Sequence, residues 1–309
     1  MLTRVCSALV WLPLVLPIAC QSTKMDSQDQ YTLIDDMEND AGARFNSPAG
    51  FPGLWYSSTP CDQRDKVTPP AYLGGENQWT FDTLETPYWT RQQSKHASRL
   101  RTNGDPTNGG GLISPAMDDS NSRDWGANMT IDLVTPPDSD AGAEPATCPP
   151  PVSTRPHPDG VALSSYSGLV FWAKASSLVD GSGEQTIYVM VHDVNSDPRG
   201  KRCNDPSFDY YATSDGKNCY NAYSKPLALS ESFERYEVDF SELQRDPTWG
   251  AFRDTQLQLG QVYMIVFEVR SPKCVTDDKA RCVGDAPQVL NFDFSIDDLY
   301  LVQHPPNQP

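Results

Sequence analysis

Apolar and polar residues alternate along much of this chain, in many short segments separated by Gly, Pro, Asn and Asp. A period of two residues is the mark of a β-strand, because successive side chains point to opposite faces. The clearest segment is 167–175, whose two faces carry Leu169, Phe171 and Ala173, and Val170, Trp172 and Lys174. The pattern predicts strands over 32–36, 54–57, 98–102, 127–133, 167–175, 185–193, 233–240, 262–270 and 290–302.

Helical periodicity is nearly absent from the sequence. Many strands with long loops and few helices favour an all-β fold, an antiparallel β-sandwich of the jelly-roll kind. We expect a single domain over 31–302, with a Pro-rich surface insertion at about 135–165 and a solvated tail over 303–309. The Pro-rich stretch could instead be a linker between two domains. We prefer an insertion, because neither half alone has enough strands for a closed sandwich.

The first 19 residues have the composition of an export signal. Arg4 precedes an apolar run from Val5 to Ile18, and small residues lead to Cys20. The end of the run resembles a bacterial lipobox, which implies a lipid on Cys20, a flexible tether over 20–30 and a place in the bacterial cell envelope. Gln21 after the cysteine favours the outer membrane in such lipoproteins. The alternative is an ordinary cleaved signal with an incidental cysteine.

Six further cysteines follow the predicted lipid site: Cys61, Cys148, Cys203, Cys219, Cys274 and Cys282. An even number in an exported chain suggests disulfides, although six cysteines allow 15 pairings. The local pairs Cys203–Cys219 and Cys274–Cys282 would each close a loop and leave Cys61 with Cys148. Zinc is the alternative, but the sequence has no CxxC and its histidines lie far from the cysteines.

The formal net charge of −17 limits the choice of partners. A surface this acidic repels phosphate backbones, so nucleic acid is an unfavourable partner. The charge is compatible with calcium binding, but many exported proteins are acidic without binding calcium.

The two ends of the predicted domain resemble those of galactose-binding-domain-like jelly rolls. Residues 33–38, LIDDME, and 294–301, FSIDDLYL, are similar to the first and last strands of family 11 carbohydrate-binding modules and of complex I intermediate-associated protein 30 domains. Between them, Gly168, Phe171, Ala173 and Lys174 match a "G-x-x-F-x-A-K" strand of these families. The strand 189–193 ending in Asp, and 236–243 running into "FS-x-L", follow in the same order. The resemblance implies a jelly roll that binds carbohydrate without catalysis.

In such domains, carboxylates of the first and last strands often surround a structural calcium ion, which takes six to eight oxygen ligands. The resemblance therefore implies a calcium site formed by Glu38 and Asp297, with Asp36 and Asp298 as further ligands. The alternative is that these acidic side chains lie at strand ends in water, or pair with Lys and Arg.

The resemblance also implies a sheet face that binds sugar. Aromatic rings stack on the C–H faces of sugars, and planar polar groups pair with their hydroxyls. The candidates are Trp172, Tyr188, His192 and Arg270 on strands, with Asp193 and Asn195 at the rim. A sandwich has two inner faces, so the sequence favours a place in the core over a ligand platform for Trp172 and Tyr188.

No nucleophile elbow, HExxH or P-loop occurs in the sequence, and we expect no enzymatic activity. The sequence therefore predicts a noncatalytic lipoprotein that binds a polysaccharide or glycan. The alternative is an envelope scaffold that has the same fold and binds protein instead of sugar.

Overall fold

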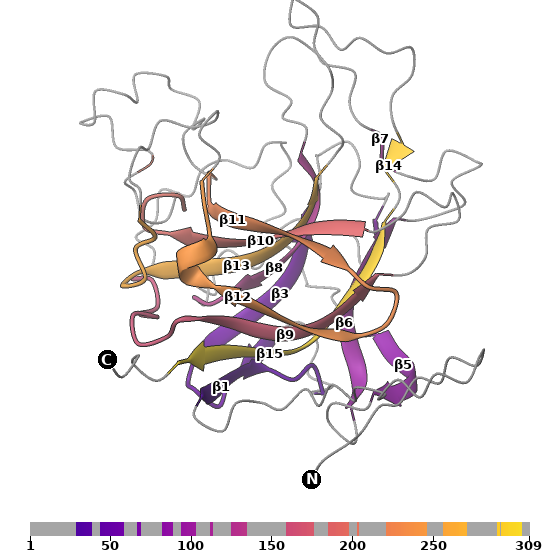
Figure 1. The fold of residues 1–309 in the computed structure, drawn as a ribbon, viewed down its shortest axis with the longest axis horizontal. Coiled ribbons are helices and arrows are strands. Elements are labelled where there is room, and N and C mark those ends of the chain that lie inside the picture. The colour runs from indigo at the N-terminus through magenta and orange to yellow at the C-terminus, as the bar shows by residue number, and fades with distance from the viewer. Residues whose placement is uncertain are drawn as a thin grey trace, which may run out of the picture.

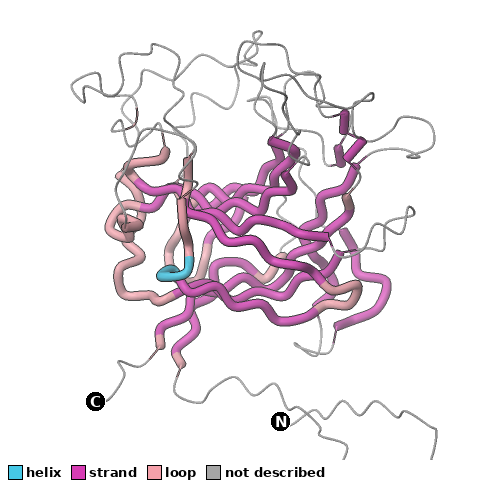
Figure 2. The backbone as a smooth tube through the Cα atoms, turned by 45° about the horizontal axis from the view of Figure 1, so that its top comes forward, coloured by secondary structure: helices cyan, strands magenta, loops and turns pink. Residues whose placement is uncertain are grey.

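The computed structural model describes residues 29–38, 44–58, 67–68, 82–88, 94–102, 112–113, 125–134, 159–175, 185–197, 203, 221–245, 256–270, 289–290 and 292–304. Within these residues the chain forms two antiparallel sheets that pack face to face as a jelly-roll sandwich (Figure 1). The predicted all-β fold is confirmed. Apart from the 3-10 helix η5 (Phe240–Glu242), the described elements are strands (Figure 2).

The first sheet has seven strands among the described residues. Its order is β12-β9-β15-β6-β4, with β1 beside β15 and β5 beside β6. The bounds are β1 (Gln30–Asp35), β4 (Val67–Thr68), β5 (Asp82–Tyr88), β6 (Ser94–Thr102), β9 (Gly168–Ala175), β12 (Glu234–Asp239) and β15 (Asp293–Gln303). The first and last strands, β1 and β15, are antiparallel neighbours, so the described chain begins and ends side by side.

The second sheet has six described strands in the order β11-β10-β13-β8-β3-β2. The bounds are β2 (Arg44–Asn46), β3 (Pro52–Ser58), β8 (Trp125–Asp132), β10 (Gln185–Asp193), β11 (Tyr223–Leu229) and β13 (Val262–Arg270). The short strands β7 (Leu112–Ile113) and β14 (Val289–Leu290) form a separate pair. The sequence pattern did not predict β11, because Pro226 interrupts it. Pro is tolerated here because β11 is an edge strand and its Pro position faces away from β10.

The core lies between the two sheets and is formed by one face of each strand. The inward residues include Leu169, Phe171 and Ala173 of β9, Ile187, Val189 and Val191 of β10, and Ile265, Phe267 and Val269 of β13. Phe171 and Phe267 meet edge to face across the sandwich, with ring centroids 5.1 Å apart. The alternation seen in the sequence therefore groups the residues of each strand face correctly, and the structure decides which face is buried.

The domain extends slightly beyond its predicted limits. The last residues of the predicted insertion belong to the sandwich, since Leu163 is fully buried in the core and Val161 bridges to Val262. His304 was predicted to lie in a solvated tail. Its ring Nδ1 lies 3.0 Å from Asp29 Oδ1, and its backbone N–H donates to Ser167 Oγ. Val161, Leu163 and His304 are thus parts of the folded domain, because each finds hydrogen-bond or core partners there.

Several sequence predictions fall outside the described residues. These are the signal segment, Cys20, most of the tether, and Cys61, Cys148, Cys219, Cys274 and Cys282. Cys203 is buried and disulfide-bonded, which is incompatible with its acting as a zinc ligand. Across the described ranges, we find no helix with the length and apolar character needed to cross a membrane.

Candidate functional site

The outer face of the six-stranded sheet is the face that points away from the core, and it carries the side chains between the core positions. In β10 these are Tyr188, Met190 and His192, which pair in register with Glu268, Val266 and Met264 of β13. Met190, Met264 and Val266 pack into a small apolar cluster with Tyr188 at its border. Glu268 and His192 therefore lie on either side of this cluster along the strands.

Arg270 and Glu268 of β13 form the charged part of this outer face, beside Tyr188. The Arg270 guanidinium lies over the Tyr188 ring, with Cζ 3.8 Å from the ring centroid, and its Nε–H donates to Glu268 Oε1 at 2.7 Å. Burial raises the pKa of the Glu268 carboxyl, and the Arg270 charge opposes this shift. Stacking and the ion pair together hold the guanidinium in a fixed plane.

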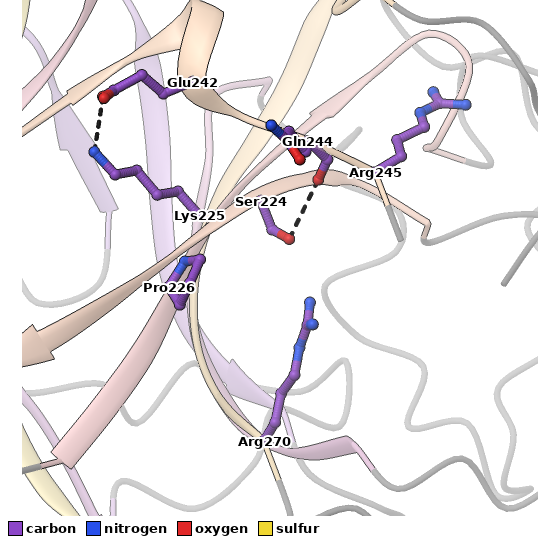
Figure 3. Close-up of a pocket in the computed structure, with 7 residues that line it drawn as sticks. All are labelled: Ser224, Lys225, Pro226, Glu242, Gln244, Arg245 and Arg270. Atoms are coloured by element: carbon purple, nitrogen blue, oxygen red, sulfur yellow. Dashed lines mark hydrogen bonds and ion pairs between the residues drawn. The ribbon is translucent and has the colours of Figure 1, made fainter. Parts of the chain in front are cut away.

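A pocket of about 340 Å³ opens beside Arg270 at the edge of the same sheet (Figure 3). It is lined by Ser224, Lys225, Pro226, Glu242, Gln244, Arg245 and Arg270. The strand β11 and the segment after η5 meet here, since Ser224 and Gln244 exchange backbone hydrogen bonds of 2.8 and 3.0 Å. Arg270 points toward Ser224 and Gln244, whereas Lys225 points toward Glu242, its partner at 2.7 Å.

The helix η5 gives Glu242 a fixed place in the pocket wall. Asp239 caps the helix by accepting a hydrogen bond from Ser241 N–H, and Glu242 accepts one from Asp239 N–H. This reciprocal arrangement is a capping box. The Lys225 ammonium lowers the pKa of the Glu242 carboxyl, so this residue is an anion at neutral pH.

The predicted rim residues Asp193 and Asn195 lie in the turn after β10 and are fully buried. The Asp193 carboxylate accepts hydrogen bonds from the N–H groups of Asn195, Ser196 and Gln258, at 2.9–3.0 Å. It also lies 3.4 Å from the Arg245 guanidinium. The structure thus uses Asp193 to hold the turn together. His192 is also buried, on the outer face beside Met264.

Trp172 does not join the other predicted ligand residues. It lies on the outer face of the seven-stranded sheet, on the opposite side of the sandwich from Tyr188. Only 8% of Trp172 is exposed, because it packs edge to face against Tyr300 and in a cluster with Val170 and Phe233. A single sugar-binding face that contains both Trp172 and Tyr188 is therefore wrong, because their strands belong to different sheets.

Of the four predicted calcium ligands, Asp36 and Glu38 follow the end of β1, and Asp297 and Asp298 lie within β15. Glu38 accepts a hydrogen bond from His96 N–H at 3.0 Å, and Asp36 accepts one from Glu38 N–H at 3.3 Å. Asp297 and Asp298 are buried at an irregularity of β15, where Asp298 has a φ of 50°. Among the described residues, however, no three acidic, His or Cys side chains gather closely enough to hold a metal ion. Calcium binding at these residues stays a prediction.

The chain is similar to solved carbohydrate-binding modules. A family 11 module of a cellulosomal cellulase of Clostridium thermocellum is 10% identical, with a TM-score of 0.41, and the match covers 88% of this chain and 94% of that one. A family 11 module from the same organism, in complex with a β-1,3-1,4-mixed-linked tetrasaccharide, is 12% identical, with a TM-score of 0.41 and coverages of 89% and 96%.

An exo-β-agarase is also similar, at 11% identity and a TM-score of 0.37. This match covers 90% of the present chain but only 26% of the agarase. No protein-family model and no curated protein matches the sequence. At these identities the similarities concern the fold.

Sequence reasoning found Tyr188 and Arg270 but missed the residues that complete the pocket. Glu268 was available as a signal, because it lies two residues before Arg270 and shares its face of the strand. Ser224 and Gln244 carried no such signal, because their pairing joins an edge strand to a segment beyond η5. Only the folded chain brings them in front of Arg270 (Figure 3).

Proposed function

We propose that this chain is a noncatalytic carbohydrate-binding protein and that the pocket beside Arg270 holds part of a polysaccharide or glycan. The observation that carries the proposal is the guanidinium of Arg270, which is fixed against Tyr188 and Glu268 at the wall of an open pocket. The planar amide of Gln244 and the Ser224 hydroxyl line the same pocket. Sugar binding requires this combination of oriented polar groups on a rigid support.

The binding mode follows from the lining. Arg270 offers N–H donors in a fixed plane, which suits two neighbouring hydroxyls of a sugar ring. The Gln244 side chain is both a donor and an acceptor, and the ring of Pro226 supplies apolar surface for the C–H face of the sugar. Arg270 covers one face of the Tyr188 ring, so Tyr188 acts through the position of Arg270 rather than as an open stacking platform.

We further propose that the protein is lipid-anchored through Cys20 in the bacterial envelope, at the outer membrane. The lipobox-like end of the signal segment supports this part. Single sugar sites of this size are commonly weak, and many anchored copies would bind one polymer together with higher avidity. Replacing Cys20 by Ser should move the protein from the membrane fraction to the soluble fraction. Unchanged membrane association of the variant would contradict the anchor.

The binding proposal is tested with a glycan array and the purified full-length protein, once with calcium and once with a chelator. We expect reproducible binding to one class of glycan, and loss of that binding in Gln244→Ala. The matched control is Gln258→Ala, which removes an exposed amide outside the pocket. Folded protein that binds no glycan, or equal binding by both variants, would contradict the proposal. A chelator effect on binding or on the melting temperature would support the separate prediction of calcium.

A further inference from the structure

The charge of the pocket lining is opposite in sign to the charge of the protein. The lining contains three cationic side chains, Lys225, Arg245 and Arg270, and one carboxylate, Glu242. The whole chain has 24 Lys and Arg against 41 Asp and Glu, a formal net charge of −17. Each of these cations has a carboxylate partner, but only Glu242 lines the pocket, while Asp193 and Glu268 are buried behind the lining. Cationic donors therefore predominate among the charged groups that an anion in the pocket can reach.

Arg270 is the cation best placed to contact an anion in this pocket. Its ion-pair partner Glu268 has a side chain that is only 11% exposed and does not line the pocket. The contact with Glu268 uses Nε, and Nη2 also contacts Met190 Sδ, a weak acceptor, at 3.9 Å. The end of the guanidinium points toward Ser224 and Gln244 (Figure 3). A planar guanidinium binds a carboxylate or sulfate through two parallel N–H···O hydrogen bonds.

The other two cations of the lining, Lys225 and Arg245, differ in their partners and in their direction. Lys225 is paired with Glu242, whose side chain is 50% exposed, and exposed pairs of this kind contribute little, so Lys225 can turn to another anion at low cost. Arg245 lies over the Tyr223 ring at 4.5 Å and close to the buried Asp193. Its guanidinium is directed away from Arg270 and its charge is balanced by Asp193, so it does not join the contact at Arg270 (Figure 3).

We infer that the pocket selects a negatively charged sugar residue, whose carboxylate or sulfate ester binds the Arg270 guanidinium. The Ser224 hydroxyl and the Gln244 amide then hydrogen-bond the ring hydroxyls of the same residue. This inference rests on the proposed function and narrows it to acidic polysaccharides. The net charge of −17 disfavours binding of such polymers to the protein in general, so we expect their binding to depend on this pocket.

The test compares polymers that differ only in charge, using affinity measurements on the full-length protein. Polygalacturonate is compared with its neutral methyl ester, and a sulfated galactan with its desulfated form. We expect binding of one or both acidic polymers that is about tenfold tighter than binding of the neutral counterpart, as one charge-assisted contact implies. The two pairs of polymers distinguish a carboxylate ligand from a sulfate ligand.

The matched variants are Arg270→Gln and Arg235→Gln. Arg235 also pairs with a Glu two residues away and also lies over a tyrosine ring, but on the other sheet and outside the pocket. We expect Arg270→Gln to lose the preference for the acidic polymer, and Arg235→Gln to keep it. Lys225→Gln, which changes a side chain on the edge strand, is the second test if Arg270→Gln does not fold. It should weaken binding of the acidic polymer and leave binding of the neutral polymer unchanged.

The outcomes separate the two proposals. Equal affinity for each acidic polymer and its neutral form would overturn this inference and leave the carbohydrate-binding proposal intact. An acidic preference that survives in Arg270→Gln and Lys225→Gln would also overturn it, because the charge recognition would then lie elsewhere. Binding of no polymer by folded protein would overturn both proposals.

Discussion

Asp35 provides a quantitative test of the electrostatics of the sandwich. It is the last residue of β1, is 3% exposed, and accepts hydrogen bonds from the Trp55 Nε1–H at 2.6 Å and the Met37 N–H at 3.1 Å. Burial disfavours the charged form and raises the pKa of Asp35 from 3.8 to about 6, although both hydrogen bonds oppose the change. The folded protein therefore binds this proton more tightly than the unfolded chain does.

The sign and size of the effect follow from this difference. Below about pH 3 Asp35 is protonated in both states and contributes no penalty. As the pH rises toward about 6, the unfolded chain releases the proton first, so the free energy of unfolding falls. The difference between 3.8 and about 6 corresponds to a total loss of about 3 kcal/mol, and the loss is constant at higher pH.

The perturbation is Asp35→Asn, which is neutral at every pH and close in shape to the protonated acid. We expect the free energy of unfolding of the wild type, minus that of the variant, to fall by about 3 kcal/mol between about pH 3 and about pH 7. Urea unfolding followed by tryptophan fluorescence measures this difference. Glu234→Gln, at an exposed position of β12, controls for the loss of one negative charge. A wild-type-minus-variant difference that does not change with pH would refute the reasoning.

Three further predictions concern packing and the ends of the domain. Phe171→Ala should lower the free energy of unfolding by about 3–5 kcal/mol in urea, because this ring is fully buried between the sheets; a loss below about 1 kcal/mol would contradict its place in the core. Gly168→Ala should lower the free energy of unfolding by about 2 kcal/mol or more in the same assay, because an added Cβ would collide with the Val238 carbonyl oxygen. A variant as stable as the wild type would show that β9 and β12 do not approach each other so closely. A hydrogen bond from Asp29 raises the pKa of His304, so this contact stabilises the fold fully below pH 6.5, and the stabilisation is lost as the pH rises through the folded-state pKa. NMR titration should show a lower His304 pKa in Asp29→Asn. An unchanged pKa would exclude the contact.

The strands with strong alternation were predictable because their pattern is local. Segments 185–193 and 262–270 coincide with β10 and β13, and the inward positions of β9 lie in the core. The sequence pattern was weak where other constraints applied. Pro226 obscured β11, and the Pro-rich context of 159–165 hid the core contact of Leu163.

The candidate site was predictable only in part, because its residues come from distant segments. Tyr188 and Arg270 were singled out for their outward positions, but their stacking depends on the pairing of β10 with β13. Asp193 was expected at a ligand rim, and the fold uses it to satisfy backbone N–H groups in a buried turn.

The sequence by itself determined that the chain is built of strands and which side chains share a face of each strand. This follows from the two-residue period of extended backbone, which depends only on neighbouring residues. The tertiary structure alone decided which sheet each strand joins, and so placed Trp172 and Tyr188 on opposite sides of the sandwich. It also brought Ser224 and Gln244 in front of Arg270, because strand order and register arise from packing between segments far apart in the chain.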